Sequence, residues 1–425
     1  MFIIKHIEIE GFWNSSRIMV DLNEDVNIFI GVNGSGKTTF INMLEATLTG
    51  DVVRLSTYRF KRIKIQLFEN NHKRSIVVEK NEITDNILVK IGTSKFDFPF
   101  FSRRDLRSHF YPNSHLNYSL VLLKERLNEL LGITYLSVHR NIVRQDSEII
   151  KEEIVNQQNP VDARLTDLMS KLTSYQLQLQ SSVNELSKKF QRSILKLMLY
   201  NPSYDELQFN SILDIDFDKL RRGLTQAYKD LGLLDEEQKQ NINQHLLVIK
   251  RASEQINKHI NKEEEKLLVN DVTALTLMKR SEKIVELSSI LEFERNEIFE
   301  PLNKYIDLIT HNFILNKELK FYNNNKIDLV FFKGKREFLT SQLSSGEKQL
   351  LILFTEALLQ KKRKCIFIAD EPELSLHISW QRKIIATLKL LNPNAQLILA
   401  THSPEIVGPL RNKTINMQDI VYNGE

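Results

Sequence analysis

A glycine-rich segment containing one lysine and two threonines offers the most specific chemistry in this sequence. Gly31, Gly36, Lys37 and Thr38 follow the spacing of a phosphate-binding loop. The glycines let backbone N–H groups converge on phosphate oxygens, the lysine reaches the β- and γ-phosphates, and the threonine hydroxyl ligates Mg²⁺. We therefore expect a nucleotide site in which Thr38 is a metal ligand. The expected nucleotide-binding residues of this loop are Asn33, Gly34, Ser35, Gly36, Lys37, Thr38 and Thr39.

Two adjacent carboxylates supply the other groups that phosphoryl chemistry needs. Asp370 and Glu371 come directly after the apolar run at 365–369, which predicts a buried strand. In phosphoryl transfer, one carboxylate holds the Mg²⁺ shell and a neighbour orients or activates the attacking water. We assign Asp370 to the metal and Glu371 to the water, so ATP and Mg²⁺ are the expected ligands.

A segment rich in serine and glycine predicts a second anion site. Ser344, Ser345, Gly346 and Glu347 precede apolar residues at helical spacing, and serine and glycine at a helix N-terminus favour anion binding. Taken alone, the segment is an ordinary helix cap. One nucleotide does not need two phosphate sites from one subunit, so we expect two copies facing head to tail, each giving this segment to the other's ATP.

The elements that must position these residues come from both ends of the chain. Apolar runs at 3–9 and 26–30 predict two strands with a turn between them, followed by the glycine-rich loop and a helix. Residues 58–98 alternate in short runs, which is typical of an antiparallel hairpin or meander. Apolar runs at 365–369 and 395–400 flank a helix pattern, and this β-α-β order predicts a parallel sheet. The predicted fold class is α/β with an antiparallel β subdomain.

Residues 156–310 differ in character and predict a helical insertion. Gln, Lys, Glu and Asn dominate, and apolar residues recur every three or four positions in stripes at 165–197 and 242–267. A narrow apolar stripe with polar flanks is typical of a coiled-coil hairpin, here projecting from the body, and a helical bundle packed on the body is the alternative. The expected division is one α/β domain formed by 1–155 and 311–425, with the insertion between its parts.

Composition excludes several classes of protein. Hydrophobic residues make up 42% and charged residues 26% of the 425 residues, which excludes a mostly disordered chain. Cys365 is the one cysteine, which excludes a disulfide scaffold, and no apolar run is long enough to span a membrane. We therefore expect a cytoplasmic protein. The net charge of +4 permits a nucleic-acid partner without requiring one.

Five short segments occur in an order that resembles the ABC-type ATPases. They correspond to the Walker A loop at 31–38, the signature at 343–349, Walker B at 370–371, the D-loop at 374–377 and the switch histidine at His402. The resemblance implies an ABC-type P-loop ATPase head, with His402 catalytic beside Glu371. Ser345 stands where most ABC proteins have glycine, and this form of the signature is similar to prokaryotic ATPases related to the overcoming-lysogenisation-defect family. Gln145 is the residue we suggest for the Q-loop.

The distance between the motifs indicates which of the ABC-type ATPases this sequence resembles most. Gly36 and Gly346 lie 310 residues apart, a gap that in SMC-like ATPases holds a coiled coil and that transporter ATPases lack. Compact proteins with this pattern resemble AriA, the ATPase scaffold of PARIS antiphage systems, which holds a separate Toprim nuclease until a viral protein triggers its release. They also resemble PtuA of Septu, which pairs with an HNH nuclease.

The resemblance therefore implies a homo-oligomeric ATPase that senses phage and controls an effector nuclease encoded by a neighbouring gene. We expect no nuclease activity in this chain, because the segment after His402 carries no cluster of metal-binding acids. The alternative is a DNA repair or maintenance ATPase, like RecF or SMC, that binds DNA directly. A transporter ATPase is a weaker third possibility.

Other clusters permit two interpretations each. Basic clusters are expected to be solvated faces, with a salt-sensitive nucleic-acid track as the alternative. They comprise Arg54, Arg59, Lys61, Arg62, Lys64, Lys73, Arg74, Arg103, Arg104, Arg107 and residues 361–364. His139 and Arg140 are expected to form a structural ion pair, with catalytic support as the alternative. Trp13 and Arg17 precede the glycine-rich loop and are candidates for contact with the nucleotide base, although core packing is the first expectation for Trp13.

Overall fold

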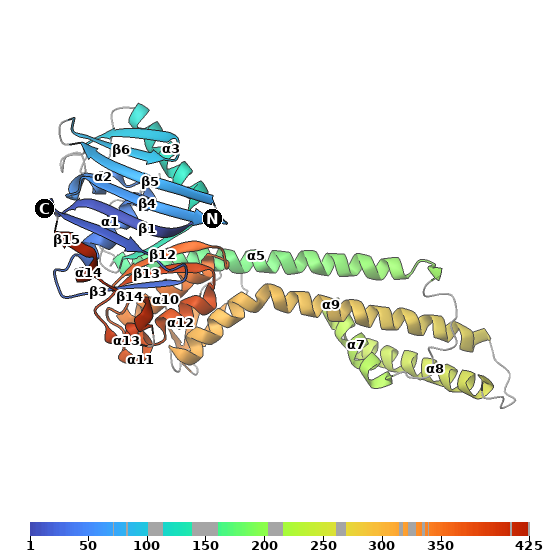
Figure 1. Ribbon diagram of the computed structural model, residues 1–425. Helices are drawn as coiled ribbons and strands as arrows, with labels where there is room; N and C mark the ends of the chain where they lie inside the picture. The colour runs from blue at the N-terminus through green and yellow to red at the C-terminus, as the bar shows by residue number, and fades with distance from the viewer. Residues whose placement is uncertain are drawn as a thin grey trace. The chain divides into compact units, whose positions relative to one another are not determined.

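The structure is a computed structural model in which two compact units can be distinguished. Residues 1–173 and 304–425 form the first unit, and residues 174–303 form the second. Figure 1 labels their helices and strands. The structure describes residues 1–70, 72–81, 84–100, 114–137, 160–202, 216–260, 269–313, 318–321, 329–333, 336–338, 340–408 and 410–423.

A five-stranded parallel sheet in the first unit is assembled from segments far apart in the sequence. Its strands, in spatial order, are β14 (Thr414–Asn416), β3 (Val26–Ile30), β13 (Ala395–Ala400), β12 (Cys365–Asp370) and β8 (Ile133–Ser137). All four neighbouring pairs are parallel, and in Figure 1 the blue β3 lies beside β13 from the other end of the chain. Every residue of β13 is buried, which explains why this strand is a continuous apolar run rather than an alternating one. The predicted α/β class is confirmed.

A second, seven-stranded antiparallel sheet forms the β subdomain. In spatial order it contains β15 (Val421–Asn423), β2 (Ser16–Asp21), β1 (Ile3–Phe12), β4 (Arg62–Glu69), β5 (His72–Asn81), β6 (Asn86–Ile91) and β7 (Ser94–Pro99). The predicted antiparallel subdomain is confirmed, but the prediction of two strands in the first 30 residues is wrong. The missed strand, β2, alternates strictly between buried and exposed residues, as expected where one face of a strand is solvated.

The helices of the first unit pack on these sheets. They are α1 (Lys37–Thr49), α2 (Val52–Thr57), α3 (Ser114–Leu130), α10 (Ser345–Leu359), α11 (Ile378–Gln381), α12 (Ile384–Leu391), α13 (Pro404–Val407) and α14 (Met417–Ile420). Ten of the thirteen residues of α1 are buried, because apolar side chains of both sheets share one core with this helix. The single helix expected between β12 and β13 is two short helices, α11 and α12. A small antiparallel sheet comprises β9 (Glu318–Phe321), β10 (Leu329–Lys333) and β11 (Arg336–Phe338).

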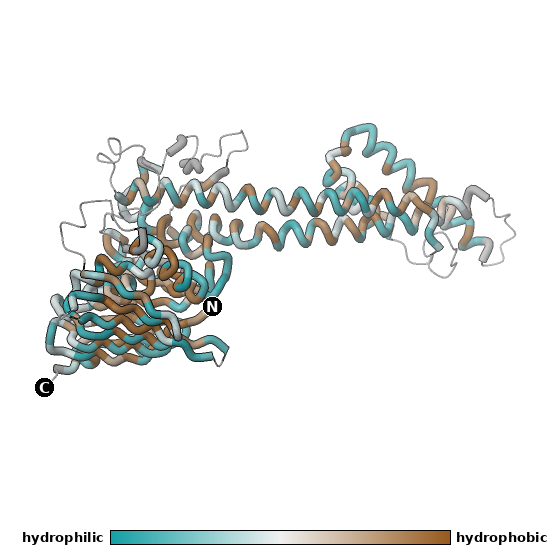
Figure 2. Tube along the Cα trace, turned by 90° about the horizontal axis from the view of Figure 1, so that it is seen from above, coloured by the Kyte–Doolittle hydropathy of each residue, from teal (hydrophilic) through white to brown (hydrophobic). Residues whose placement is uncertain are grey.

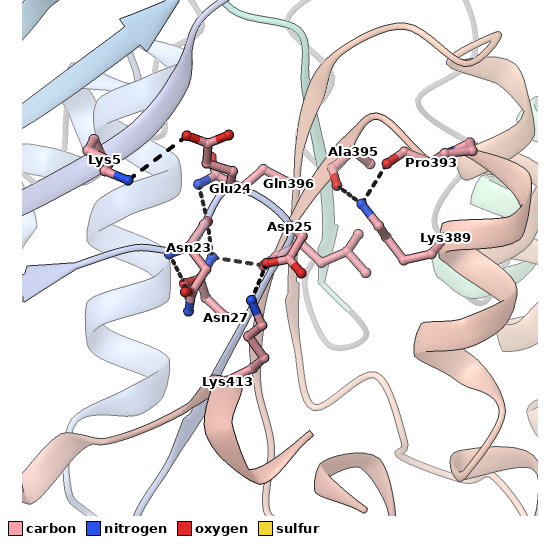
Figure 3. A network of polar contacts seen from close by, with 11 residues as sticks. Lys5, Asn23, Glu24, Asp25, Asn27, Lys389, Pro393, Ala395, Gln396 and Lys413 are labelled. Atoms are coloured by element: carbon pink, nitrogen blue, oxygen red, sulfur yellow. Dashed lines mark hydrogen bonds and ion pairs between the residues drawn. The ribbon is translucent and has the colours of Figure 1, made fainter. Parts of the chain in front are cut away.

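A buried amide joins the two large sheets. Gln396, on β13, is fully buried. Its Oε1 accepts from the N–H of Ile4 at 2.8 Å, and its Nε2 donates to the carbonyl of Ile4 at 2.7 Å and to that of Asn23 at 2.8 Å. The side chain thus occupies the place of a neighbouring strand for one residue of β1. Figure 3 shows Gln396 beside Asn23 in the surrounding network of polar contacts. Because a buried amide without partners would destabilise the fold, this set of bonds fixes where β1 lies on the parallel sheet.

The second unit consists of helices. It contains most of two long helices, α5 (Pro160–Leu197) and α9 (Val269–Asn312), together with α7 (Phe217–Asp230) and α8 (Glu236–Ile260). The helical insertion is confirmed, and brown apolar positions recur along the two long helices between teal polar ones (Figure 2). Phe190 of α5 packs with Leu291 of α9 and with Ala227 of α7. Across the described ranges, no helix combines the length and the apolar character needed to cross a membrane.

The partner of the first apolar stripe differs from the expectation. The stripes at 165–197 and 242–267 suggest the two arms of a hairpin, but the helix that runs beside α5 is α9. The second stripe belongs largely to α8, which packs on α7 through Leu220, Leu224, Ile242 and Leu246. A Cβ on Gly223 of α7 would lie 2.3 Å from Val285 of α9, so glycine permits close contact between these helices. The choice between a projecting hairpin and a packed bundle stays a prediction.

Candidate active site

The carboxyl edge of the parallel sheet brings together segments from three strands. In the register of the sheet, Asp370 at the end of β12 pairs with Ala400 at the end of β13, and Ala400 pairs with Phe29 of β3. The three strands therefore end level with one another. The glycine-rich loop follows β3, the two adjacent carboxylates end β12, and the segment with His402 follows β13.

The glycine-rich loop has the backbone conformation that a phosphate site requires. Gly34 and Gly36 have φ angles of 81° and 93°, in the left-handed region that other residues adopt at a cost. A Cβ on Gly36 would also lie 3.0 Å from the rings of Phe12 and Trp13. Gly36 directly precedes α1, whose N-terminus receives no hydrogen bond from a capping side chain. The first N–H groups of α1 are thus left for a ligand, and anions suit this position.

Lys37 lies inside the loop rather than at the surface. Its ammonium donates to the carbonyls of Gly31 at 2.9 Å and Val32 at 3.2 Å, and the residue is buried. Burial lowers the pKa of Lys37, and the negative charges of Glu371 and Asp370 partly oppose this shift. The loop therefore surrounds a positive charge that has no direct carboxylate partner among the described residues.

The remaining loop residues differ in their exposure. Asn33 and Gly34 are exposed at the mouth of the loop, whereas Ser35 and Thr39 are partly buried. The Oγ atom of Ser35 is buried and accepts or donates no hydrogen bond among the described residues. An unsatisfied hydroxyl in a phosphate loop is consistent with a ligand that supplies the missing partner.

Thr38 and Asp370 meet at the point where the metal ligands are expected. The Thr38 hydroxyl donates to Oδ1 of Asp370 at 3.3 Å. A hydroxyl and a carboxylate are both hard oxygen ligands of the kind that Mg²⁺ prefers. The donor set present here therefore fits Mg²⁺ beside a bound nucleotide.

Glu371 and His402 face each other across the end of the sheet. Nε2 of His402 lies 3.8 Å from Oε1 of Glu371, and both side chains remain about one third exposed, at 38% and 34%. Glu371 has a φ of 50°, and its N–H donates to the carbonyl of Ala400 at 2.8 Å. A left-handed conformation at a residue other than glycine costs roughly 1 kcal/mol or more and is concentrated at functional sites. The strained turn keeps Glu371 accessible beside His402.

Glu373 is a residue of this site that the sequence offers only as an alternative to Glu371 for the catalytic role, with no partner of its own. Its side chain is buried, and Oε1 accepts from Thr401 Oγ1 at 2.5 Å, from the N–H of His402 at 2.9 Å and from the N–H of Ser403 at 3.2 Å. The third acid of the segment 370–373 was the available signal. Its partners are nearly thirty residues away in sequence, so spacing alone could not show them.

The signature segment begins helix α10. The Ser344 hydroxyl accepts from the N–H of Glu347 at 3.3 Å, and the Glu347 carboxylate accepts from the N–H of Ser344 at 2.8 Å, which completes a capping box. Ser344 and Ser345 are exposed, whereas Gly346 is buried. A Cβ on Gly346 would lie 2.6 Å from the carbonyl oxygen of Ser375, so this glycine packs against the D-loop of its own chain.

Helix α10 is also held by the ends of the two long helices. Within the first unit, Asp162 of α5 forms an ion pair with Lys348, with Oδ1 2.7 Å from Nζ. Arg164 of α5 forms an ion pair with Glu356. The hydroxyl of Tyr305, near the end of α9, lies 2.6 Å from Oγ1 of Thr355. The signature helix thus contacts the parts of both long helices that belong to the first unit.

The expectation of core packing for Trp13 is wrong. Trp13 is 45% exposed, and its ring lies against that of Phe12, with centroids 4.7 Å apart. The residue adopts a φ of 55° in the turn after β1 and touches the glycine-rich loop at Gly36. Arg17, the other candidate for contact with the base, forms an ion pair with Glu8. Trp13 is therefore better placed than Arg17 to contact the base of a nucleotide bound at the loop.

The described basic clusters pair with acids in several places. Arg54 belongs to α2 and not to the β meander, and it forms ion pairs with Glu45 and Asp51. Arg62 lies 3.4 Å from Glu79 on the neighbouring strand. These pairs favour the interpretation of a solvated face with mixed charge over a nucleic-acid track. Six residues that the sequence singles out lie outside the described part of the chain: Arg103, Arg104, Arg107, His139, Arg140 and Gln145.

Comparison with known families places this geometry in context. The sequence profile of the AAA ATPase domain, AAA_15, matches residues 1–407. The chain belongs to the AAA_15 family of ATPases. The match includes the glycine-rich loop, the signature segment, Asp370, Glu371 and His402, so family membership supports nucleotide binding at this edge of the sheet.

Individual proteins are also similar to this AAA_15 ATPase, two of them over most of its length. A probable ATPase of retron Vc95 from Vibrio cholerae serotype O1 biovar El Tor is 21% identical over 97% of this chain and 73% of its own length. A probable ATPase of retron Ec83 from Escherichia coli is 22% identical over 97% of this chain and 70% of its own length. Septu protein PtuA of Bacillus thuringiensis is 27% identical over 26% of this chain and 32% of its own.

Solved structures that align with this chain include heads of Smc proteins. The Smc head domain of Pyrococcus furiosus with an extended coiled coil, bound to the C-terminal domain of ScpA, aligns with a TM-score of 0.42 and 12% identity. The alignment covers 98% of this chain and 93% of that one. The Smc head of Pyrococcus yayanosii with a coiled coil and joint has a TM-score of 0.41 and 13% identity, over 98% and 95% of the two chains.

Proposed function

We propose that this protein binds ATP with Mg²⁺ and hydrolyses it, as the sensor and scaffold of an antiphage defence system that controls a nuclease supplied in trans. The observation that carries the ATPase part is the 3.8 Å separation of Glu371 and His402, at the sheet edge where Thr38 also meets Asp370. Groups for binding phosphate, holding a metal and accepting a proton are then all within one site.

Each residue has a separate task in this proposal. Thr38 and Asp370 would hold Mg²⁺, which when bound neutralises charge on the β- and γ-phosphates. Lys37 would exchange its bonds to the loop carbonyls for bonds to phosphate oxygens. Glu371 would accept a proton from the attacking water at its carboxylate, and His402 would orient that water or the γ-phosphate from Nε2.

The signature segment would act on the nucleotide of a second copy. Ser344 and Ser345 are exposed at the N-terminus of α10, where hydroxyl and N–H groups favour an anion. In a head-to-tail pair, ATP would join two copies through Ser344, Ser345, Gly346 and Glu347, and hydrolysis would separate them. The exposed position of the two serines supports this arrangement.

The defence role is supported by the relatives rather than by the site. Two retron ATPases match 97% of the chain, and part of the chain matches Septu PtuA. In this role the effector nuclease is encoded by a neighbouring gene, a phage protein is the trigger, and the specific group proposed is AriA of PARIS. The nuclease activity would lie in the partner and not in this chain.

The ATPase part is tested by phosphate release from the purified chain with Mg²⁺ and ATP. The defence part is tested by co-expression with the neighbouring gene, purification, and phage challenge of cells carrying both genes, with Lys37→Ala as the control. We expect a stable complex and protection that Lys37→Ala abolishes. Cleavage of DNA or RNA by the purified single chain with Mg²⁺ or Mn²⁺ would overturn the division of labour between ATPase and nuclease.

A further inference from the structure

Glu373 holds the segment that carries His402 through a single carboxylate oxygen. Oε1 accepts hydrogen bonds from three consecutive residues: from the hydroxyl of Thr401 at 2.5 Å, and from the N–H groups of His402 at 2.9 Å and Ser403 at 3.2 Å. Hydrogen bonds to an ionised acceptor are about twice as strong as those between neutral groups. One buried carboxylate oxygen therefore determines the backbone position of the whole segment after β13.

The other oxygen of Glu373 argues against a purely stabilising role. Oε2 is buried and has no hydrogen-bond partner among the described residues. A buried polar atom without a partner destabilises the folded state, by about 1–3 kcal/mol for a neutral group and more for a charged one. Because this unsatisfied oxygen lowers the stability of the fold, stability alone does not account for a glutamate at this position. The function of Glu373 therefore lies in the bonds that Oε1 accepts.

The bonds of Glu373 and Glu371 together position His402 beside Glu371. The N–H of Glu371 donates to the carbonyl of Ala400 at 2.8 Å, which fixes Glu371 at the end of β13. Two residues later, Glu373 fixes His402, which is two residues after Ala400. Both bonds join the same two segments, so together they set the 3.8 Å separation between Glu371 Oε1 and His402 Nε2.

Glu373 is itself poorly placed to activate water. The whole residue is 9% exposed, whereas the side chain of Glu371 is 34% exposed. All three donors on Oε1 belong to the protein, and Oε2 is buried, so neither oxygen is open to an attacking water. The geometry is therefore that of a support for His402 and not of a second base.

We infer that Glu373 is a positioning residue of the ATPase site, whose Oε1 holds the backbone of His402 so that its imidazole faces Glu371. This inference rests on the proposed ATPase function. It predicts that Glu373 acts on turnover through His402 and leaves nucleotide binding to the glycine-rich loop.

The test compares Glu373→Ala, Glu373→Gln, His402→Ala and the double variant Glu373→Ala with His402→Ala. Steady-state ATP hydrolysis gives kcat and KM, a fluorescent ATP analogue gives Kd, and thermal unfolding gives Tm. We expect kcat of Glu373→Ala to fall by about 100-fold, as for a misplaced catalytic group, with Kd changed less than threefold. Glu373→Gln keeps an acceptor oxygen and the shape of the side chain, so its kcat should be about tenfold higher than that of Glu373→Ala.

The double variant separates positioning from a structural role. If Glu373 acts through His402, removing Glu373 from a protein that already lacks the imidazole should lower kcat no further than His402→Ala alone. Glu405→Ala is the matched control, because Glu405 is a carboxylate on the same segment that pairs with Arg382, and it should keep wild-type kcat.

Three results would overturn the inference: wild-type kcat in Glu373→Ala or in His402→Ala, losses that multiply in the double variant, or equal kcat for Glu373→Gln and Glu373→Ala at equal Tm. Glu373→Gln also guards against misfolding, since it preserves the volume of the side chain. Failure of the proposed ATPase function gives a different pattern, in which the wild-type chain and its partner complex release no phosphate at all.

Discussion

Thr38 and Asp370 are 332 residues apart in sequence, yet the hydroxyl of Thr38 donates to Oδ1 of Asp370 at 3.3 Å. The contact exists because β3 and β12 flank β13 in one parallel sheet, which brings the ends of all three strands to one edge. The predictions that follow concern the groups around this contact.

Removal of the Lys37 ammonium should strongly weaken nucleotide binding without unfolding the protein. Lys37→Ala removes the charge that faces the phosphates, and the burial that lowers the pKa of this lysine disfavours its charged form in the folded protein. We expect Kd for ATP to rise by about 100-fold and Tm to stay within a few degrees. Lys383→Ala, at an exposed lysine, is the control. Normal ATP binding by folded Lys37→Ala would exclude the loop as the site.

Loss of the carboxylate of Glu371 should separate binding from hydrolysis. Glu371→Gln preserves the size of the side chain and removes the proton acceptor, so ATP should bind normally while kcat falls by about 100-fold or more. The ATP-bound pair should then persist, and gel filtration with ATP and Mg²⁺ should show a larger species than for Lys37→Ala. Wild-type turnover in Glu371→Gln would move the role of base to another residue.

A methyl group on Gly346 should disturb the contact between α10 and the D-loop. The Cβ of Gly346→Ala would lie 2.6 Å from the carbonyl oxygen of Ser375, and relief of this overlap requires the backbone to shift. We expect a loss of about 1–3 kcal/mol of unfolding free energy, measured by urea denaturation. Ser345→Ala, at the exposed neighbouring position, should keep the stability of the wild type. Unchanged stability of Gly346→Ala would show that the contact is looser than described.

The exposed indole of Trp13 should contribute to nucleotide affinity. An aromatic ring that stacks on a base contributes about 1–3 kcal/mol, so Trp13→Ala should weaken ATP binding by about tenfold, whereas Trp13→Phe should weaken it less. The chain has two tryptophans. In a Trp380→Phe background the fluorescence of Trp13 alone should therefore respond to ATP. No fluorescence response together with unchanged Kd in Trp13→Ala would exclude contact with the base.

Sequence determined the local chemistry of this protein. The spacing of Gly31, Gly36, Lys37 and Thr38 specifies a loop conformation within a few residues, and the carboxylates at 370 and 371 follow directly from an apolar strand. Signals of this kind act through short-range backbone geometry, so they can be recognised without knowing what packs against them. The α/β class, the antiparallel subdomain and the helical insertion followed from periodicity for the same reason.

Tertiary structure alone decided which distant groups meet. Nothing near Gln396 in sequence indicates that its amide binds Ile4, or that the helix beside α5 is α9 rather than the stripe at 242–267. The role of Glu373 was likewise invisible, because its three donors come from another strand end. Such contacts depend on the order of strands in a sheet and on the close packing of helices, which many sequence patterns satisfy equally well. Only the folded chain selects one of them.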